Sequence, residues 1–258
     1  MKVAAYQAPI AASDPTAAID LVREQLAACE SAGVQILCCP EAILGGLADY
    51  APDPRSIAID VEGGRLNDVL RPLASDRVTT IIGFTEIDDA GTLFNSAAVL
   101  HRGTVIGVYR KHHPAINRSV YAAGESTPTF TVGALRFGIV ICRDSTFTEP
   151  AKTMASQGAT VLFIPTNNAL PATKGGPKLV ADAGRCDTER ATENRVTVVR
   201  SDVAGHAGHL VSYGSTGVVG PDGTILARAA ELVPELVIVE IGDEDRRLTS
   251  SLVSFNST

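Results

Sequence analysis

The stretch Leu135–Pro150, LRFGIVICRDSTFTEP, carries the pattern from which the rest of the chain can be interpreted. An apolar run over Phe137–Ile141 predicts a buried strand, which delivers Cys142 into a short polar turn, Arg143–Ser145. Thr148–Pro150 then predicts the start of a helix. Backbone N–H groups of a turn and of a helix N-terminus favour negative charge, so a thiol at this junction is well placed to act as a nucleophile.

The length of 258 residues is long for one average domain, but α/β folds of this size commonly form a single unit, and we expect one domain over residues 1–258. A hydrophobic content of 45% is sufficient for a large core, so neither a metal nor a disulfide is needed for stability. The net charge of −7 argues against nucleic acid or an anionic membrane as a partner. No apolar segment approaches the roughly 20 residues of a membrane span. The opening MKVAAYQAPI predicts a first β-strand rather than a signal peptide, and we expect a cytoplasmic protein.

The cysteines show no pattern of paired spacing. The chain has five, without a CxxC pair that would indicate zinc or a redox dithiol, and we expect all of them to be reduced. A free cysteine is most often a small buried hydrophobic residue, and we expect this of the four other than Cys142: Cys29, Cys38, Cys39 and Cys186.

Short apolar runs alternate with helical patterns along the whole chain. Strands are predicted over Lys2–Ala8, Val34–Cys39, Val78–Ile87, Leu93–Leu100, Thr104–Tyr109, Ala159–Pro165, Arg195–Val203 and Leu236–Ile241. Helices are predicted from an N-cap at Asp14 to Gly33, around Leu66–Leu73, and over Thr148–Gln157 and Pro177–Asn194, with a hairpin over Gly217–Ala227. The order strand, helix, strand, hairpin occurs twice. This repetition predicts two similar sheets packed together, with helices on the outer faces.

Three reactive side chains come directly after predicted strands. Glu41 follows Val34–Cys39, Lys111 follows Thr104–Tyr109, and Cys142 follows the apolar run described above. Functional groups of α/β sheets lie just beyond the carboxyl ends of strands. A carboxylate can act as a general base toward a thiol, and an ammonium group can stabilise an oxyanion. Together they suffice for acyl transfer through a thioester, without a metal or an organic cofactor.

The chain resembles the carbon–nitrogen hydrolase (nitrilase) superfamily in segments that span nearly its whole length. The segments that contain the three reactive residues are CCPEAIL, VYRKHHP and GIVICRDSTFTEPA, and further similarity lies in KVAAYQAP, GATVLFIPTNN, RATENRVTVVRSDVAG and SYGSTGVVGPDGTILA. The resemblance implies a four-layer α-β-β-α sandwich that forms homodimers or larger homo-oligomers. It also implies hydrolysis of a non-peptide C–N bond in a small-molecule substrate such as an amide.

Carried onto this sequence, the resemblance implies a role for each reactive residue. Glu41 is the general base that takes the proton of Cys142 and later activates water. Cys142 attacks the carbonyl carbon, and Lys111 binds the oxyanion together with the backbone N–H of Arg143. No cofactor or metal is expected.

Two positions depart from the pattern of the family. Arg143 stands where many members have an aromatic residue; it is either a surface residue or a bidentate ligand for a substrate carboxylate. Counting seven residues back from Gly124 reaches Asn117, where many members have a second glutamate. Asn167 and Asn168 follow the strand Ala159–Pro165 and are predicted to line the substrate pocket.

Other functions remain open on the sequence alone. An N-carbamoyl amide hydrolase or a nitrilase could use the same three residues, although the Trp-Glu pair of nitrilases does not follow Cys142. A Cys142–His113 dyad would also make a hydrolase, but it leaves Glu41 and Lys111 without a role. From a different class, a catalytically silent binding module is possible. The histidines lack the further ligands that a zinc site requires.

Overall fold

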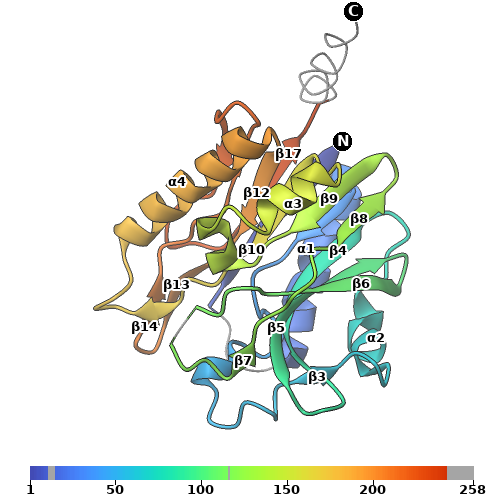
Figure 1. Cartoon of the computed structure of the whole chain (residues 1–258), viewed down its shortest axis with the longest axis vertical. Coiled ribbons are helices and arrows are strands. Elements are labelled where there is room, and N and C mark those ends of the chain that lie inside the picture. Colours follow the sequence, from blue (N-terminus) through green and yellow to red (C-terminus); the bar gives the residue numbers. More distant parts are fainter. Residues whose placement is uncertain (11–14, 116, 243–258) are drawn as a thin grey trace, which may run out of the picture.

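The computed structural model describes residues 1–10, 15–115 and 117–242, and in these residues two β-sheets stack between two layers of helices (Figure 1). This arrangement confirms the predicted α-β-β-α sandwich. Two successive series, each starting with a strand and a helix and ending in a hairpin, build the two halves, as the repeated order in the sequence predicts.

The first sheet is built mainly by the N-terminal half of the chain. Its strands lie in the order β11-β14-β13-β1-β2-β4-β5-β6, with β17 and β3 paired to β1 and β4, and β7 to β5. Their bounds are β1 Lys2–Pro9, β2 Ile36–Cys38, β3 Ile59–Asp60, β4 Thr79–Ile87, β5 Leu93–His101, β6 Thr104–Arg110, β7 Tyr121–Ala122, β11 Leu170–Pro171, β13 Val203–Ala207, β14 Leu210–Ser212 and β17 Glu235–Glu240. The parallel β1, β2 and β4 form its centre.

The second sheet has the order β16-β15-β12-β10-β9-β8. Its strands are β8 Thr129–Val132, β9 Leu135–Ile139, β10 Val161–Pro165, β12 Thr197–Ser201, β15 Gly217–Val219 and β16 Ile225–Arg228. Here β9, β10 and β12 are parallel, so their carboxyl ends meet at one edge of the sheet, and every residue of β10 and β12 is buried.

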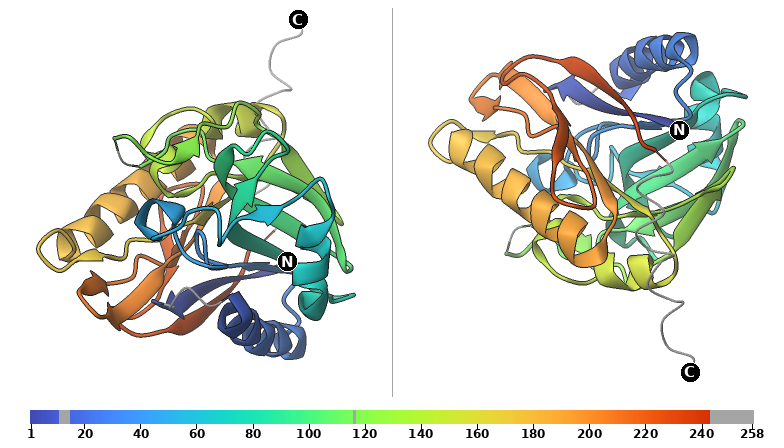
Figure 2. Two further views of the ribbon diagram at one scale, coloured as in Figure 1. Left: turned by 90° about the horizontal axis from the view of Figure 1, so that it is seen from below. Right: turned by 90° about the horizontal axis from the view of Figure 1, so that it is seen from above.

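Helices cover the outer face of each sheet, on opposite sides of the molecule (Figure 2). The helix α1, Pro15–Ala32, packs Val22 and Leu26 against Tyr6 of β1, next to α2, Arg65–Leu70, and the 3₁₀ turn η2, Arg71–Leu73. On the other sheet, α3, Ala151–Ser156, and α4, Pro177–Asn194, bury Met154 and Ala191.

The core between the sheets follows from the alternation of side chains along the buried strands. Val3 and Ala5 of β1 belong to the cluster shared with the second sheet, whereas Ala4 and Tyr6 belong to the cluster beneath α1. Cys38 belongs to the cluster between the sheets and Cys39 to the cluster beneath α1, and both are fully buried. A strand covered on both faces explains why the sequence there is continuously apolar.

Most predicted elements are confirmed, and α4 has the predicted bounds. The single strand predicted over Arg195–Val203 is wrong, because the chain leaves the second sheet at Ser201 and enters the first as β13. Asp202 lies at this crossing, where its buried carboxylate accepts the backbone N–H of Val203 at 2.8 Å. The short helix begins at Ala151 rather than Thr148, and a 3₁₀ turn, η3, precedes it over Cys142–Thr146. The N-cap predicted at Asp14 lies outside the described residues.

No helix within the described ranges is both long and apolar enough to cross a bilayer.

Candidate active site

The ends of β2, β6 and β9 bring Glu41, Lys111 and Cys142 to one cavity of about 350 Å³. Glu41 follows β2 after Cys39 and Pro40, Lys111 comes directly after β6, and Cys142 opens the turn η3. The first two belong to the first sheet and Cys142 to the second. The cavity therefore lies where the corresponding ends of the two sheets meet.

Glu41 and Lys111 form a buried ion pair in this cavity. The Nζ of Lys111 lies 2.5 Å from Oε1 of Glu41, and each side chain is only 2% exposed. Asn95 Nδ2, on β5, donates to the same oxygen at 2.8 Å, and the backbone N–H of Asn167 donates to Oε2 at 3.0 Å. Three donors thus fix both carboxylate oxygens, which leaves the Glu41 side chain little rotational freedom.

The environment of Lys111 keeps its ammonium group charged. Burial alone lowers the pKa of Lys111, but the Glu41 carboxylate and the neighbouring Cys142 raise it above its ordinary value. A cation that is desolvated and fixed is stronger as an electrostatic stabiliser than the same cation in water.

Cys142 occupies a strained position at the start of η3. Its φ is 45°, in the left-handed region that costs a residue with a side chain about 1–3 kcal/mol. The hydroxyl of Ser145 donates to the carbonyl oxygen of Cys142 at 2.7 Å, and the backbone N–H of Asp144 donates to Ile141 at 2.9 Å. These bonds hold the turn, in which Cys142 is a partly exposed residue that lines the cavity.

The thiol of Cys142 is neutral near neutral pH. Burial and the Glu41 carboxylate raise its pKa to about 12, against the opposing effect of the Lys111 and Arg200 charges. A neutral thiol requires a base to remove its proton during attack. The Glu41 carboxylate lies in the same cavity and can accept that proton.

Asp144 ties the turn η3 to the residues on either side of Lys111. Its fully buried carboxylate accepts the hydroxyl of Tyr109 at 2.7 Å, the backbone N–H of His113 at 2.8 Å and that of Ile141 at 3.1 Å. The ring of His113 also bonds to Asp144 and stacks on Phe147. His113 is absent from the residues that line the cavity, so the described geometry does not support the Cys142–His113 dyad.

The remaining residues predicted for the site divide into two groups. Asn167 and Asn168 line the cavity, and Asn168 is held by Asp202, which accepts its side-chain and backbone N–H groups at 2.8 and 3.0 Å. Arg143 and Asn117 do not line it. The guanidinium of Arg143 instead donates to the carbonyl oxygen of Ala115 at 2.6 Å, and Asn117 is exposed.

Sequence reasoning missed several residues of the cavity. Asn95 lies inside β5, where a polar residue in an otherwise apolar buried run was the available signal. Asp49 and Lys174 bring further charges into the cavity wall, and Ser119 and Val120 hold the carboxylate of Asp49 from the opposite loop. The rest of the wall is completed by Leu47, Tyr50, Ala115, Tyr121, Ala169, Leu170 and Pro171.

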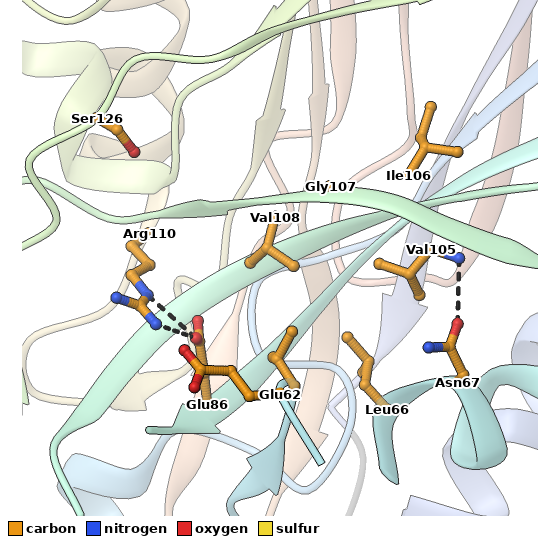
Figure 3. Close-up of a pocket in the computed structure, with 11 residues that line it drawn as sticks. Glu62, Leu66, Asn67, Glu86, Val105, Ile106, Gly107, Val108, Arg110 and Ser126 are labelled. Carbon is orange, nitrogen blue, oxygen red and sulfur yellow. Dashed lines mark hydrogen bonds and ion pairs between the residues drawn. The ribbon is translucent and has the colours of Figure 1, made fainter. Parts of the chain in front are cut away.

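A second hollow of about 450 Å³ lies beside β6 and contains none of the three reactive residues (Figure 3). Glu86, which is buried, and Arg110 are paired there at 2.5 Å, and the Arg110 guanidinium also stacks on Phe94. Since successive residues of extended chain point to opposite sides, anchoring Arg110 here turns Lys111 toward Glu41. Among the described residues, no group of three or more His, Cys, Asp or Glu side chains could hold a metal ion.

Comparison with known proteins places the chain in one family. The sequence model of the family "Carbon-nitrogen hydrolase" matches residues 2–249. The chain is 29% identical to a nitrilase of Pyrococcus abyssi over 81% of its length and 77% of the relative's. It is 28% identical to an (R)-stereoselective amidase of Pseudomonas sp. over 89% of its length and 81% of the relative's. Among solved structures, a mutant of the Nesterenkonia AN1 amidase from the nitrilase superfamily superposes with a TM-score of 0.78 at 24% identity, covering 99% of this chain and 96% of that one.

Proposed function

The chain belongs to the carbon-nitrogen hydrolase family and is a hydrolase of C–N bonds other than peptide bonds, and from this premise we propose that it hydrolyses a small amide through a thioester on Cys142. One observation carries the proposal. A fixed carboxylate, a buried ammonium group and a thiol, on Glu41, Lys111 and Cys142, line the same cavity.

In the acylation step, Glu41 accepts the proton of the Cys142 thiol as the sulfur attacks the carbonyl carbon of the amide. The carbonyl π electrons move to the oxygen, which becomes an oxyanion beside the Lys111 ammonium group and the backbone N–H of Arg143. Glu41 then passes the proton to the amide nitrogen, the C–N bond breaks, and ammonia or an amine leaves. An acyl group remains on Cys142 as a thioester.

In the deacylation step, water enters the place of the departed nitrogen. Glu41 takes one of its protons while the water oxygen attacks the thioester carbonyl, and Lys111 again stabilises the oxyanion. The C–S bond breaks, the acid product leaves, and the proton returns from Glu41 to Cys142. Because Glu41 alternates between base and acid, it must stay close to both reacting groups, which its three hydrogen-bond donors ensure.

The cavity supports a small substrate. Its volume is at the low end of the ~300–1,000 Å³ found for ligand sites. The wall carries one acidic group, Asp49, and one basic group, Lys174, so the amides to be tested should include neutral, cationic and anionic examples.

The experiment is a screen for ammonia release from small amides, N-carbamoyl compounds and nitriles, with Cys142→Ala protein as the matched control. We expect turnover of at least one amide by the native protein and none by Cys142→Ala. Turnover by Cys142→Ala would refute the mechanism. Turnover of nitriles alone would favour the second candidate, a nitrilase, which the similarity to the Pyrococcus abyssi relative supports.

Two further expectations from the sequence, a homodimer and a cytoplasmic location, stay predictions alongside this function.

A further inference from the structure

Arg200 is the largest fully buried side chain of the described residues, and it lies in the middle of the second sheet on β12. Its Nε donates to both carboxylate oxygens of Asp187 on α4, at 2.8 and 3.0 Å. Replacing a buried ion pair with apolar residues of similar volume is often neutral or stabilising. A gain in stability is therefore a poor explanation for the buried charges of Arg200 and Asp187. The other contacts of the Arg200 guanidinium indicate a role in positioning.

One arm of the Arg200 guanidinium reaches the nucleophile turn. Nη2 donates to the Oγ of Ser145 at 2.9 Å, and the Ser145 hydroxyl donates in turn to the carbonyl oxygen of Cys142 at 2.7 Å. Arg190, one turn further along α4 than Asp187, donates to the backbone carbonyl of Ser145 at 3.3 Å. Helix α4 thus supports the turn that begins at Cys142 in two ways, directly through Arg190 and through the ion pair of Asp187 with Arg200.

The other arm reaches the segment that supports the general base. Nη1 of Arg200 donates to the Oγ1 of Thr166 at 2.6 Å. The carbonyl oxygen of Thr166 accepts the backbone N–H of Glu41 at 3.2 Å. A single planar guanidinium therefore spans from the backbone of Cys142, at the end of one sheet, to the backbone of Glu41, at the end of the other. An arginine fork is well suited to such a bridge, because its donors have a fixed relative geometry.

We propose that Arg200, oriented by its ion pair with Asp187, is a positioning residue that sets the turn at Cys142 against the segment that supports Glu41, and that its buried guanidinium places a positive charge near Cys142. This inference rests on the proposed function of Cys142 and Glu41. It extends that function by assigning the Arg200–Asp187 pair, Ser145 and Thr166 a part in the geometry of attack, although none of the four touches the substrate in the proposed mechanism.

The positioning part is tested with Ser145→Ala, which removes the link to Cys142 and leaves the ion pair intact. The matched control is Ser75→Ala, because the Ser75 hydroxyl is also buried and bonds to Glu30 at 2.5 Å, on the α1 side of the molecule. We expect both variants to lose a similar amount of stability in urea unfolding. Only Ser145→Ala should lower kcat, severalfold and with little change in KM. A kcat for Ser145→Ala equal to that of Ser75→Ala would overturn the positioning role.

The charge part is tested by labelling Cys142 with two reagents, anionic iodoacetate and neutral iodoacetamide. The ratio of the two rate constants is independent of the fraction of thiolate, and it reports the local charge. The double variant Arg200→Gln/Asp187→Asn removes both charges and leaves neither partner ionised alone. Arg200→Lys keeps the positive charge but loses the fork. We expect the iodoacetate-to-iodoacetamide ratio to fall severalfold in the double variant and to stay near the native value in Arg200→Lys, whose kcat nevertheless falls.

A native ratio in the folded double variant would overturn the charge role. If that variant does not fold, Arg200→Lys and Ser145→Ala still decide the matter, because an unchanged kcat in both would contradict the proposal. The labelling ratio is measured on the thiol and needs no turnover. Failure of the proposed function, seen as activity in Cys142→Ala, is therefore distinguishable from failure of this inference.

Discussion

The Nζ of Lys111 lies 2.5 Å from Oε1 of Glu41, and both side chains are 98% removed from solvent. The two residues come from different strands of the first sheet, and their pairing fixes the positions of a base and of an oxyanion ligand at once. In the proposed mechanism, both Glu41 and Lys111 are needed for catalysis, and each also keeps the other in place.

Glu41→Gln should abolish most turnover while the fold is kept. The amide can still bond to Lys111 and Asn167, but it cannot take a proton from Cys142 or from water. Removing a general base typically costs about 10²–10⁴ in rate. Steady-state ammonia release measures this, with Glu125→Gln as the control, since Glu125 is exposed and does not line the cavity. A Glu41→Gln enzyme within a fewfold of native kcat would remove Glu41 from the mechanism.

Lys111→Met should lower both activity and stability, because it leaves a buried carboxylate without its cation. Breaking one side of a buried pair costs about 3–5 kcal/mol. The double variant Glu41→Gln/Lys111→Met should regain much of that stability, since no charge is then left unpaired, yet remain inactive. Urea unfolding of the native protein, Lys111→Met and the double variant tests whether the two charges stabilise the fold as a pair. Equal stability of the single and double variants would show that the pair does not act as one unit.

Arg143 and Lys174 should differ in their effect on substrates that carry a carboxylate. Lys174 lines the cavity, whereas Arg143 bonds to the carbonyl of Ala115, which is part of the cavity wall. Lys174→Ala should therefore raise KM for anionic amides alone, and Arg143→Ala should raise KM for anionic and neutral amides alike. If Arg143→Ala affects anionic amides selectively, the carboxylate-binding role predicted from the sequence is the better account of its side chain.

Stability should fall at alkaline pH in a way that depends on Cys142. Its folded-state pKa is raised to about 12 from the ordinary value of 9.0, so the native state keeps a proton that the unfolded chain loses. Below pH 9 both states hold the proton and the contribution is fully present; it is lost as the pH rises from 9 through about 12. The slope is on the order of 1 kcal/mol per pH unit for one group. Unfolding curves of Cys142→Ala should show a correspondingly flatter decline, and parallel declines would contradict the raised pKa.

The functional residues at the ends of strands could be predicted from the sequence, whereas the contacts made by side chains within the strands could not. Glu41, Lys111 and Cys142 each end an apolar run, and a general rule for α/β sheets selects such positions without knowledge of which strands are neighbours. Asn167 and Asn168 were found in the same way. The four-layer arrangement followed from the repeated order of strands, helices and hairpins, together with the resemblance to a known family.

The contacts that support these residues join distant parts of the chain, and periodicity does not contain that information. Asn95 meets Glu41 across the first sheet, and Arg200 meets Ser145 and Asp187 across the second. Arg200, a charged residue within an apolar run, was visible in the sequence as a candidate for a buried ion pair. Its partners could not be predicted, because they depend on the order of the strands in the sheet. For the same reason Arg195–Val203 was predicted as one strand, although the chain changes sheets at Asp202.

The central claim is that Cys142 carries the acyl group during turnover, and mass spectrometry of the acid-quenched enzyme tests it most directly. Native protein is mixed with an amide that the screen identifies as a substrate, quenched, digested and analysed. The account predicts that the peptide containing Cys142 gains the mass of the acyl group less one hydrogen, and that this modification is absent when the substrate is omitted. Continued turnover with no adduct on Cys142 under conditions that saturate the enzyme, together with full activity of Cys142→Ala, would contradict it.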